Sequence, residues 1–226
     1  MAYWLEPAPL VAALIFGSMH RYFIKTPWLV KRLFSSYVWD MPGDEKVVYL
    51  TFDDGPHPTI TPWVLGELKT FGAQATFFCI GKNVVQYPEV FQQVQGAGHS
   101  VGNHTFNHLN GWKSGVKAYI DNTREATGYI SSQLFRPPYG RIKKQQARGI
   151  LKLLGAESKI IMWDVLSADF DGAISAEQCL QNVLKHTLPG SIIVFHDSEK
   201  AYPHLHYVLP KVLEHLSAKG YRFKSL

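Results

Sequence analysis

Short apolar segments alternate with longer amphipathic segments from Lys46 to the end of the chain. The short segments are brief and rich in β-branched residues, as buried strands are, and the longer ones have the periodicity of helices. Predicted strands are residues 47–52, 75–80, 100–102, 134–136, 159–163, 191–195 and 221–224. This alternation favours a parallel sheet or barrel.

The predicted helices between these strands have recognisable starts. Thr61 stands before a proline, Pro88 opens a second helix, and Ser175 with Gln178 forms a capping box. Further helices are predicted over residues 114–130, 143–154 and 204–219. About seven alternations of strand and helix indicate an α/β fold, a distorted TIM-like (β/α) barrel with about seven strands.

One domain with an N-terminal extension accounts for the length of the chain. The 226 residues show no shift of composition and no low-complexity linker, so we assign residues 46–226 to the domain and residues 1–45 to the extension. Hydrophobic residues make up 46% and charged residues 18%, which is typical of a compact enzyme and argues against disorder.

Charge and cysteine content limit the partners and the metal ligands that the chain can have. The 23 Lys and Arg exceed the 18 Asp and Glu, but they are scattered along the chain, so we expect no nucleic-acid partner. Cys79 and Cys179 each lie in an apolar stretch, and we expect two buried thiols rather than a disulfide. A metal site must therefore use histidines and carboxylates.

The extension combines an apolar segment with a segment in which basic and aromatic residues alternate. Residues 10–16 are too short to span a bilayer, and no basic residue precedes them as a secretory signal requires. Residues 10–39 could associate with a membrane through an interfacial helix beginning near Pro27, but a helix that closes one end of the core is the favoured interpretation. We therefore expect a cytoplasmic or peripherally membrane-associated protein.

Seven polar residues fall at or just beyond the carboxyl ends of predicted strands. They are Asp53, Asp54, His104, Arg136, Asp164, Asp169 and His196. In a parallel barrel the carboxyl ends of the strands meet at one mouth, so the pattern predicts one shared site.

Two adjacent carboxylates, Asp53 and Asp54, end the first apolar strand ahead of the turn residues Gly55 and Pro56. Adjacent side chains of an extended strand point to opposite sides, so one carboxylate can bind a metal while the other faces an attacking water. The alternative is that the pair only caps the turn, because Asp-Gly-Pro is common turn chemistry. These four residues alone leave both interpretations open.

A pair of histidines, His104 and His108, is spaced by four residues. On a helical turn this spacing projects both imidazoles from one face, which suits two ligands of one metal ion. Together with a carboxylate, the pair would form a facial His-His-Asp set with open positions for water and substrate.

Five segments in a fixed order resemble the polysaccharide deacetylase family, also called the NodB-homology or carbohydrate esterase family 4 domain. They are Thr51-Phe52-Asp53-Asp54-Gly55-Pro56, Ala75-Thr76-Phe77-Phe78, the stretch from Gly98 to His108, Arg136-Pro137-Pro138-Tyr139-Gly140, and Val194-Phe195-His196. The resemblance covers the chain from about Lys46 onward. It implies a distorted (β/α) barrel that removes N-acetyl groups from a polysaccharide or oligosaccharide of the chitooligosaccharide or peptidoglycan type.

The resemblance also implies a metal site and a base. Asp54, His104 and His108 are implied as metal ligands, and the metal of the family is usually zinc, sometimes cobalt or nickel. Asp53 is implied as the general base, which Arg136 holds ionised.

The same resemblance implies an acid and a site for the acetyl group. His196 would be the general acid, tuned by Asp169. Tyr139 would lend its backbone N–H to the oxyanion, and Val194 would help to receive the acetyl methyl. These roles suit amide hydrolysis, which needs an activated water, a stabilised oxyanion and a proton for the leaving amine.

Three residues depart from the pattern of the family. Leu166 stands where members usually carry another Asp, Phe170 where they carry Trp, and Val194 where they carry Leu. These departures alter the groove wall and the presumed methyl pocket, so they put substrate preference in doubt more than the chemistry.

Two other functions remain open. A glycosidase could use Asp53 and Asp169 as its carboxylate pair without metal, although His104 and His108 would then have no role. A catalytically silent carbohydrate-binding barrel is the second alternative, and it is disfavoured because base, ligands and acid are all present.

Overall fold

The computed structural model describes residues 22–226, so the apolar segment 10–16 lies outside the described residues. The strands in this part are β1 (Val47–Asp53), β2 (Ala75–Cys79), β3 (Ser100–Asn103), β4 (Leu134–Phe135), β5 (Lys159–Ile160), β6 (Val165–Leu166), β7 (Ile192–His196) and β8 (Arg222–Phe223). All seven predicted strands are present with shifted ends, and only the two-residue β6 was not predicted.

The helices alternate with these strands along the chain. They are α2 (Trp28–Leu33), α3 (Ile60–Thr70), α4 (Gly81–Gln86), α5 (Pro88–Gly96), α6 (Val116–Thr127), α7 (Lys144–Leu154), α8 (Ala176–His186) and α9 (Tyr202–Ala218), with short 3-10 helices η1 (Gly111–Lys113) and η2 (Pro138–Gly140). The capping box predicted at the start of α8 is confirmed, because the Ser175 hydroxyl accepts the N–H of Gln178.

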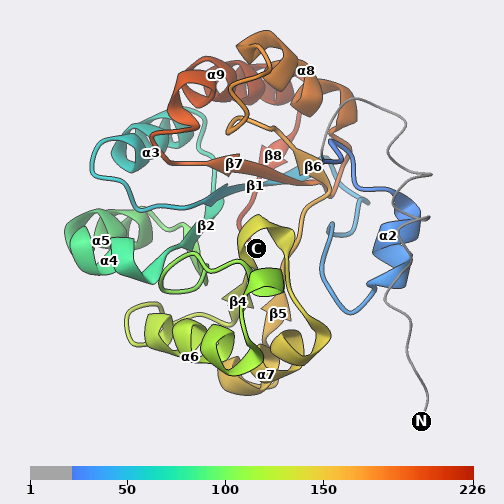
Figure 1. Ribbon diagram of the computed structural model, residues 1–226. Helices are drawn as coiled ribbons and strands as arrows, with labels where there is room; N and C mark the ends of the chain where they lie inside the picture. The colour runs from blue at the N-terminus through green and yellow to red at the C-terminus, as the bar shows by residue number, and fades with distance from the viewer. Residues whose placement is uncertain (1–21) are drawn as a thin grey trace.

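The strands form one curled sheet in the order β5-β4-β3-β2-β1-β7-β6, and β8 pairs with the start of β1. The pairings between these strands are parallel. Figure 1 shows the strands in the middle of the molecule and the helices in a ring around them. The predicted distorted (β/α) barrel with about seven strands is confirmed.

Strand β1 shows how the sheet separates the hydrophobic core from the site. Phe52 is fully buried and stacks on Phe77 at 5.0 Å, in a core shared with apolar residues of α3, α5, α8 and α9. Side chains alternate along a strand. Thr51 and Asp53 therefore point to the other side, into the barrel, where both bind Arg136.

Residues 22–41 bridge the two ends of the sheet, β5 and β6, which do not pair with each other in the described structure. Val38 pairs with Ile161 beside β5, and Lys25 pairs with Val165 in β6. In Figure 1, α2 accordingly lies between α7 and α8. No residue of α2 is buried, so backbone pairing, rather than the apolar face of this helix, closes the gap. Membrane association of this segment stays an untested alternative.

Asp164 was predicted to lie at the mouth with the other polar residues, and this prediction is wrong. The expected strand 159–163 already ends at Ile160, so Asp164 stands before β6 instead of after a strand. Its buried carboxylate accepts hydrogen bonds from Lys25 Nζ at 2.5 Å and Ser191 Oγ at 2.6 Å, and it also pairs with Lys31. Asp164 therefore anchors the N-terminal segment.

We expect Asp164→Asn to lower the free energy of unfolding, because the substitution leaves the cations of Lys25 and Lys31 without their buried partner. A fully buried pair would lose more, but these lysines are 20–30% exposed, so the expected loss is about 1–2 kcal/mol. Urea unfolding measures the change. The control is Asp121→Asn, which removes only exposed ion pairs. A midpoint equal to that of the unmodified protein would show that Asp164 does not anchor the segment.

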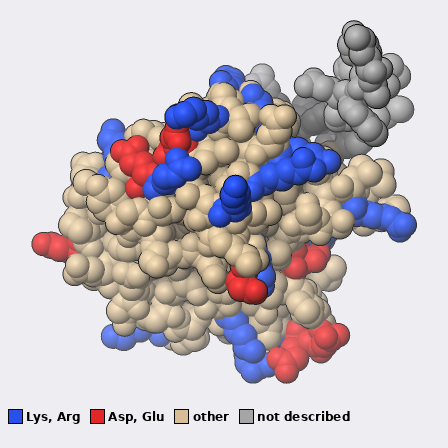
Figure 2. Space-filling view, turned by 90° about the horizontal axis from the view of Figure 1, so that it is seen from below, with Lys and Arg blue, Asp and Glu red and all other residues tan. Residues whose placement is uncertain are grey.

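The surface carries its charges in a dispersed pattern. On the face shown in Figure 2, Lys and Arg side chains are scattered, and several adjoin Asp or Glu. Within residues 22–226, none of the helices combines the length and the apolar character that crossing a membrane requires.

Candidate active site

The carboxylate of Asp53 is held in the barrel by a buried guanidinium. Arg136, which follows β4, donates from Nη1 to Asp53 Oδ1 and to Thr51 Oγ1, each at 2.7 Å. Its Nη2 donates to Met162 O at 2.9 Å, and its guanidinium lies 4.1 Å from the centre of the Phe78 ring. This network fixes the position of the Asp53 carboxylate and pairs its negative charge with the Arg136 guanidinium.

Burial of Arg136 disfavours the charged form of its guanidinium. The side chain is fully buried, and this burial lowers the pKa of the Arg136 guanidinium, while the Asp53 carboxylate counteracts the effect. The charges of Arg136 and Asp53 therefore stabilise each other, because an unpaired buried charge costs several kcal/mol.

Three potential metal ligands meet at the end of β1 and beyond β3. One donor atom each of Asp54, His104 and His108 lies within 4.8 Å of the others. Asp54 Oδ1 is 3.1 Å from His108 Nε2 and 3.7 Å from His104 Nε2. The structure therefore brings together the three residues singled out in the sequence.

A folded loop, not a helical turn, brings the two imidazoles together. Residues 104–110 contain no helix, and Thr105 and His108 have positive φ values of 65° and 56°. The side chain of Asn122 in α6 holds the loop by accepting the N–H groups of Phe106 and Asn107, each at 3.0 Å. The expectation of a helical turn was wrong, although the rings do lie side by side, with centroids 5.1 Å apart.

The protonation of His104 suits a metal ligand. Its Nδ1 lies 2.8 Å from the carbonyl oxygen of Arg136, to which it donates, so the lone pair is on Nε2 and faces Asp54. Burial lowers the pKa of His104 to about 4, which keeps the ring neutral. Metal binding requires this neutral form.

The carboxylate of Asp54 also fits a cation. Its Oδ1 is buried and has no hydrogen-bond partner in the described structure. Burial alone would raise the pKa of Asp54, but the imidazoles of His108 and His196 outweigh it and hold the pKa below the usual range of a carboxyl. A divalent ion would satisfy this oxygen, and two imidazoles with one carboxylate are a typical zinc ligand set.

His196, at the end of β7, forms a pair with Asp169, in the loop after β6. Asp169 Oδ1 accepts from His196 Nδ1 at 2.7 Å, and Oδ2 accepts from the His196 backbone N–H at 2.8 Å. Burial alone would lower the pKa of His196, but the Asp169 carboxylate, with Asp54 and Asp53, outweighs it and raises the pKa to about 9. The Asp169 carboxylate therefore favours the protonated form of His196.

The register of the sheet places this pair opposite the base. Asp53 and His196 are partners in the parallel pairing of β1 with β7. Thr51 and Val194 are partners one step earlier on the same face, and Leu166 is the partner of Val194 in β6. Val194 and Leu166 thus provide an apolar floor directly below the two polar groups.

Aromatic residues surround the polar groups. Tyr139, in η2 with a φ of 60°, is 59% exposed, and its ring lies 4.6 Å from that of His108. Phe170 packs edge-on against His196 at 5.2 Å and contacts Tyr22 of the N-terminal segment at 5.6 Å. Tyr139 therefore flanks the site beside His108, and Phe170 flanks it beside His196.

Sequence reasoning missed one buried carboxylate, that of Asp197. Its two oxygens accept the N–H of Gly55 at 3.0 Å and the hydroxyl of Thr61 at 2.5 Å. Burial raises the pKa of Asp197 to about 8, against the opposing effect of the Thr61 hydrogen bond. Its position after His196 was visible in the sequence, but its partners belong to another loop.

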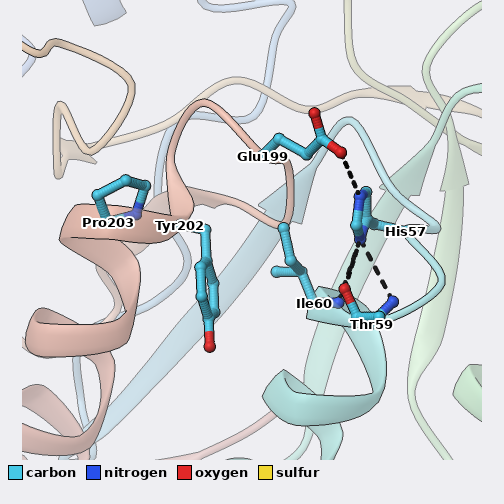
Figure 3. A pocket seen from close by; sticks show the side chains of 6 residues that line it. All are labelled: His57, Thr59, Ile60, Glu199, Tyr202 and Pro203. Carbon is cyan, nitrogen blue, oxygen red and sulfur yellow. Dashed lines mark hydrogen bonds and ion pairs between the residues drawn. The ribbon is translucent and has the colours of Figure 1, made fainter.

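A small pocket lies on the rim where the loops after β1 and β7 meet. Figure 3 shows it between the starts of α3 and α9, lined by His57, Thr59, Ile60, Glu199, Tyr202 and Pro203. His57 accepts the N–H groups of Thr59 and Ile60 on Nδ1 and faces Glu199 with Nε2 at 3.4 Å. The Nδ1 atom of His57 is thus engaged by the start of α3, and His57 lies outside the group formed by Asp54, His104 and His108.

The geometry argues against a pair of carboxylates acting as in a glycosidase. Asp169 is fully buried behind His196, and both of its oxygens are engaged there. Asp53 is paired with Arg136. A glycosidase needs two carboxyl groups that reach the scissile bond, and Asp169 does not meet this need.

Known proteins share both the sequence pattern and the fold. The sequence profile described as polysaccharide deacetylase matches residues 40–158. A peptidoglycan-N-acetylglucosamine deacetylase of Bacillus cereus is 34% identical over 190 residues, which cover 82% of this chain and 88% of that protein. A chitooligosaccharide deacetylase of Azorhizobium caulinodans is 36% identical over 165 residues, covering 68% of this chain and 75% of that protein.

The likeness extends to three dimensions. A crystal structure of the Bc1960 peptidoglycan N-acetylglucosamine deacetylase superposes with a TM-score of 0.76 and 32% identity, covering 84% of this chain and 91% of that one. The sequence profile spans more than half of the chain, and the relatives span most of it. The chain therefore belongs to the polysaccharide deacetylase family.

Proposed function

We propose that this protein is a metal-dependent deacetylase that hydrolyses the N-acetyl groups of N-acetylated glycans. The observation that carries the proposal is the convergence of Asp53, the Asp54-His104-His108 set and His196 at the carboxyl ends of neighbouring strands. Relatives named for peptidoglycan and for chitooligosaccharides support this substrate class. We further propose zinc as the metal, with cobalt or nickel as substitutes.

The metal ligands in this proposal are Asp54, His104 and His108. A divalent ion held by these residues would acidify a water and polarise the acetamide carbonyl. The ligand side chains prepare this binding themselves, since His104 is fixed by the Arg136 carbonyl and Asp54 offers an oxygen that accepts no hydrogen bond within the described residues.

Asp53 is the proposed general base. Arg136 binds its Oδ1, which leaves Oδ2 to take the proton of the attacking water. Because Arg136 is fully buried and bonded to Thr51 and a backbone carbonyl, the carboxylate cannot rotate freely away from this position. Tyr139 is the proposed backbone donor to the oxyanion.

His196 is the proposed general acid. Its Nδ1 is committed to Asp169, so Nε2 is the nitrogen that gives its proton to the leaving amine. The Asp169 carboxylate favours the protonated ring, as an acid that must be charged before each turnover requires. The fully buried position of Asp169 makes this interaction strong, because water does not screen it.

The pairing of His196 with Asp169 predicts a pH dependence. The pKa of His196 is raised to about 9, so the acid is present below this pH and is lost above it. Asp169→Asn removes the charge that raises this pKa, and the alkaline limb of kcat should move to lower pH by about 1–3 units with the metal content unchanged. Asp171→Asn, which removes a carboxylate of the same loop, is the control. An unmoved limb in Asp169→Asn would assign the acid elsewhere.

The substrate class is tested by acetate release from a panel of glycans with the zinc-loaded protein. Chitooligosaccharides of increasing length and peptidoglycan glycan strands form the panel, and new reducing ends are measured alongside acetate. Acetate without new reducing ends is the expected product pattern. New reducing ends without acetate would instead support a glycosidase, and binding with neither product would support a silent carbohydrate-binding barrel.

A further inference from the structure

Asp197 holds the backbone on both sides of Asp54. Its backbone N–H donates to Asp53 O at 3.1 Å, and its Oδ1 accepts the N–H of Gly55 at 3.0 Å. These two hydrogen bonds reach the residues directly before and after Asp54. Asp197 is 1% exposed, so the bonds form away from water, where they are most effective.

Asp54 needs such support because of its backbone conformation. Its φ of 82° lies in the left-handed region, which costs a non-glycine residue of order 1 kcal/mol or more. Asn83 provides further support by donating from Nδ2 to Asp54 O at 2.7 Å. The surrounding structure, rather than the local preference of the chain, therefore determines where the Asp54 carboxylate lies.

Gly55 permits the close approach of Asp197. A Cβ on Gly55 would lie 2.1 Å from Asp197 Oδ2 and 2.7 Å from Oδ1. A side chain at this position would push the carboxylate away and break its bond to the Gly55 N–H. The Asp197 carboxylate therefore occupies the space that a side chain at residue 55 would need.

The other oxygen of Asp197 connects to the first turn of α3. Thr61 donates its hydroxyl to Oδ2 at 2.5 Å and accepts the N–H of His57 at 2.8 Å. The β1–α3 loop, which carries the proposed base and a metal ligand, is thereby joined to the β7–α9 loop, which follows the proposed acid. Figure 3 shows the outer side of this junction, where His57 and Glu199 meet.

We propose that Asp197 is a positioning residue that sets the Asp54 carboxylate for metal binding and fixes the Asp53 base relative to His196. The inference rests on the proposed deacetylase function, but it concerns a residue that acts only through its neighbours. Asp197 is linked to Asp53, Asp54 and His196. It follows His196 directly in the chain, and it forms hydrogen bonds with Asp53 and Gly55, the two neighbours of Asp54.

The test measures zinc affinity of the metal-stripped protein by competition with a chromophoric chelator, followed by kcat and KM of the zinc-saturated protein. Asp197→Ala should weaken zinc binding about 10- to 100-fold, as loss of a group that orients a ligand typically does. Its kcat should fall at saturating zinc while KM changes little. Asp197→Asn keeps an oxygen for the Gly55 N–H and should recover most of the affinity.

Two further variants separate positioning from general stability. Thr61→Val removes one of the two side-chain bonds and should weaken zinc binding about 2- to 10-fold. Asp164→Asn is the matched control, because it alters an equally buried, hydrogen-bonded carboxylate at the opposite ends of the strands. This control should lose stability and keep the zinc affinity.

The proposal is overturned if Asp197→Ala binds zinc as tightly as the unmodified protein, or if Asp164→Asn weakens zinc binding equally. Should Asp197→Ala fail to fold, Thr61→Val decides, since unchanged affinity in that variant contradicts the proposal. Failure of the deacetylase function has a different signature. The unmodified protein would then release no acetate, whatever the zinc affinities of the variants.

Discussion

Asp53→Asn is expected to lower kcat by about 10²–10⁴-fold while the protein keeps its metal. The free energy of unfolding should also fall, because buried Arg136 loses the charge that it pairs with. The amide has nearly the shape of the carboxylate, and its oxygen can still accept from Arg136 Nη1, which is 2.7 Å away in the unmodified protein. It cannot accept the proton of the attacking water. The loss should therefore appear in kcat, with KM little changed, and metal content measured on the same sample excludes loss of the ion.

A matched control for this variant is Asp44→Asn, which changes an exposed carboxylate just before β1. It should retain full turnover. Turnover near normal in Asp53→Asn with metal bound would contradict the assignment of the base.

His104→Ala is expected to remove metal and activity together. His104 is one of three proposed protein ligands, it is 2% exposed, and its orientation is fixed by the Arg136 carbonyl. Loss of a ligand from a three-residue site removes a large part of the binding free energy of the ion. Zinc content after gel filtration and acetate release from the same sample measure both effects.

The control is His99→Ala, because His99 is also a buried imidazole but bonds to the backbone N–H of Ala75 at the start of β2. This variant should lose stability and keep its zinc. If His104→Ala bound zinc with unchanged stoichiometry, the proposed ligand set would be wrong.

The strands were predictable because most are short apolar runs that end at turn residues or polar groups. Strand β6 was not predicted, because one strand was expected over residues 159–163. In the structure that strand already ends at Ile160 and β6 begins at Val165, which led to the wrong placement of Asp164. The bridging role of residues 22–41 depends on backbone pairing with Ile161 and Val165. Such isolated pairing could not be predicted from the pattern of side chains.

The candidate site residues could be named from the sequence, but their arrangement could not. The loop that carries His104 and His108 is shaped by Asn122 of α6, which is distant in the sequence. The role of Asp197 likewise depends on β7 lying next to β1, so that its carboxylate reaches Gly55. Local patterns predict which chemistry is available, whereas contacts between distant segments decide where it is placed.

The most direct test of the account is acetate release from an N-acetylated glycan by the metal-stripped protein before and after titration with zinc. The account predicts no acetate from the stripped protein and a rate that rises with zinc until one ion is bound per chain. Acetate release at the same rate without zinc, and in the presence of chelator, would contradict it.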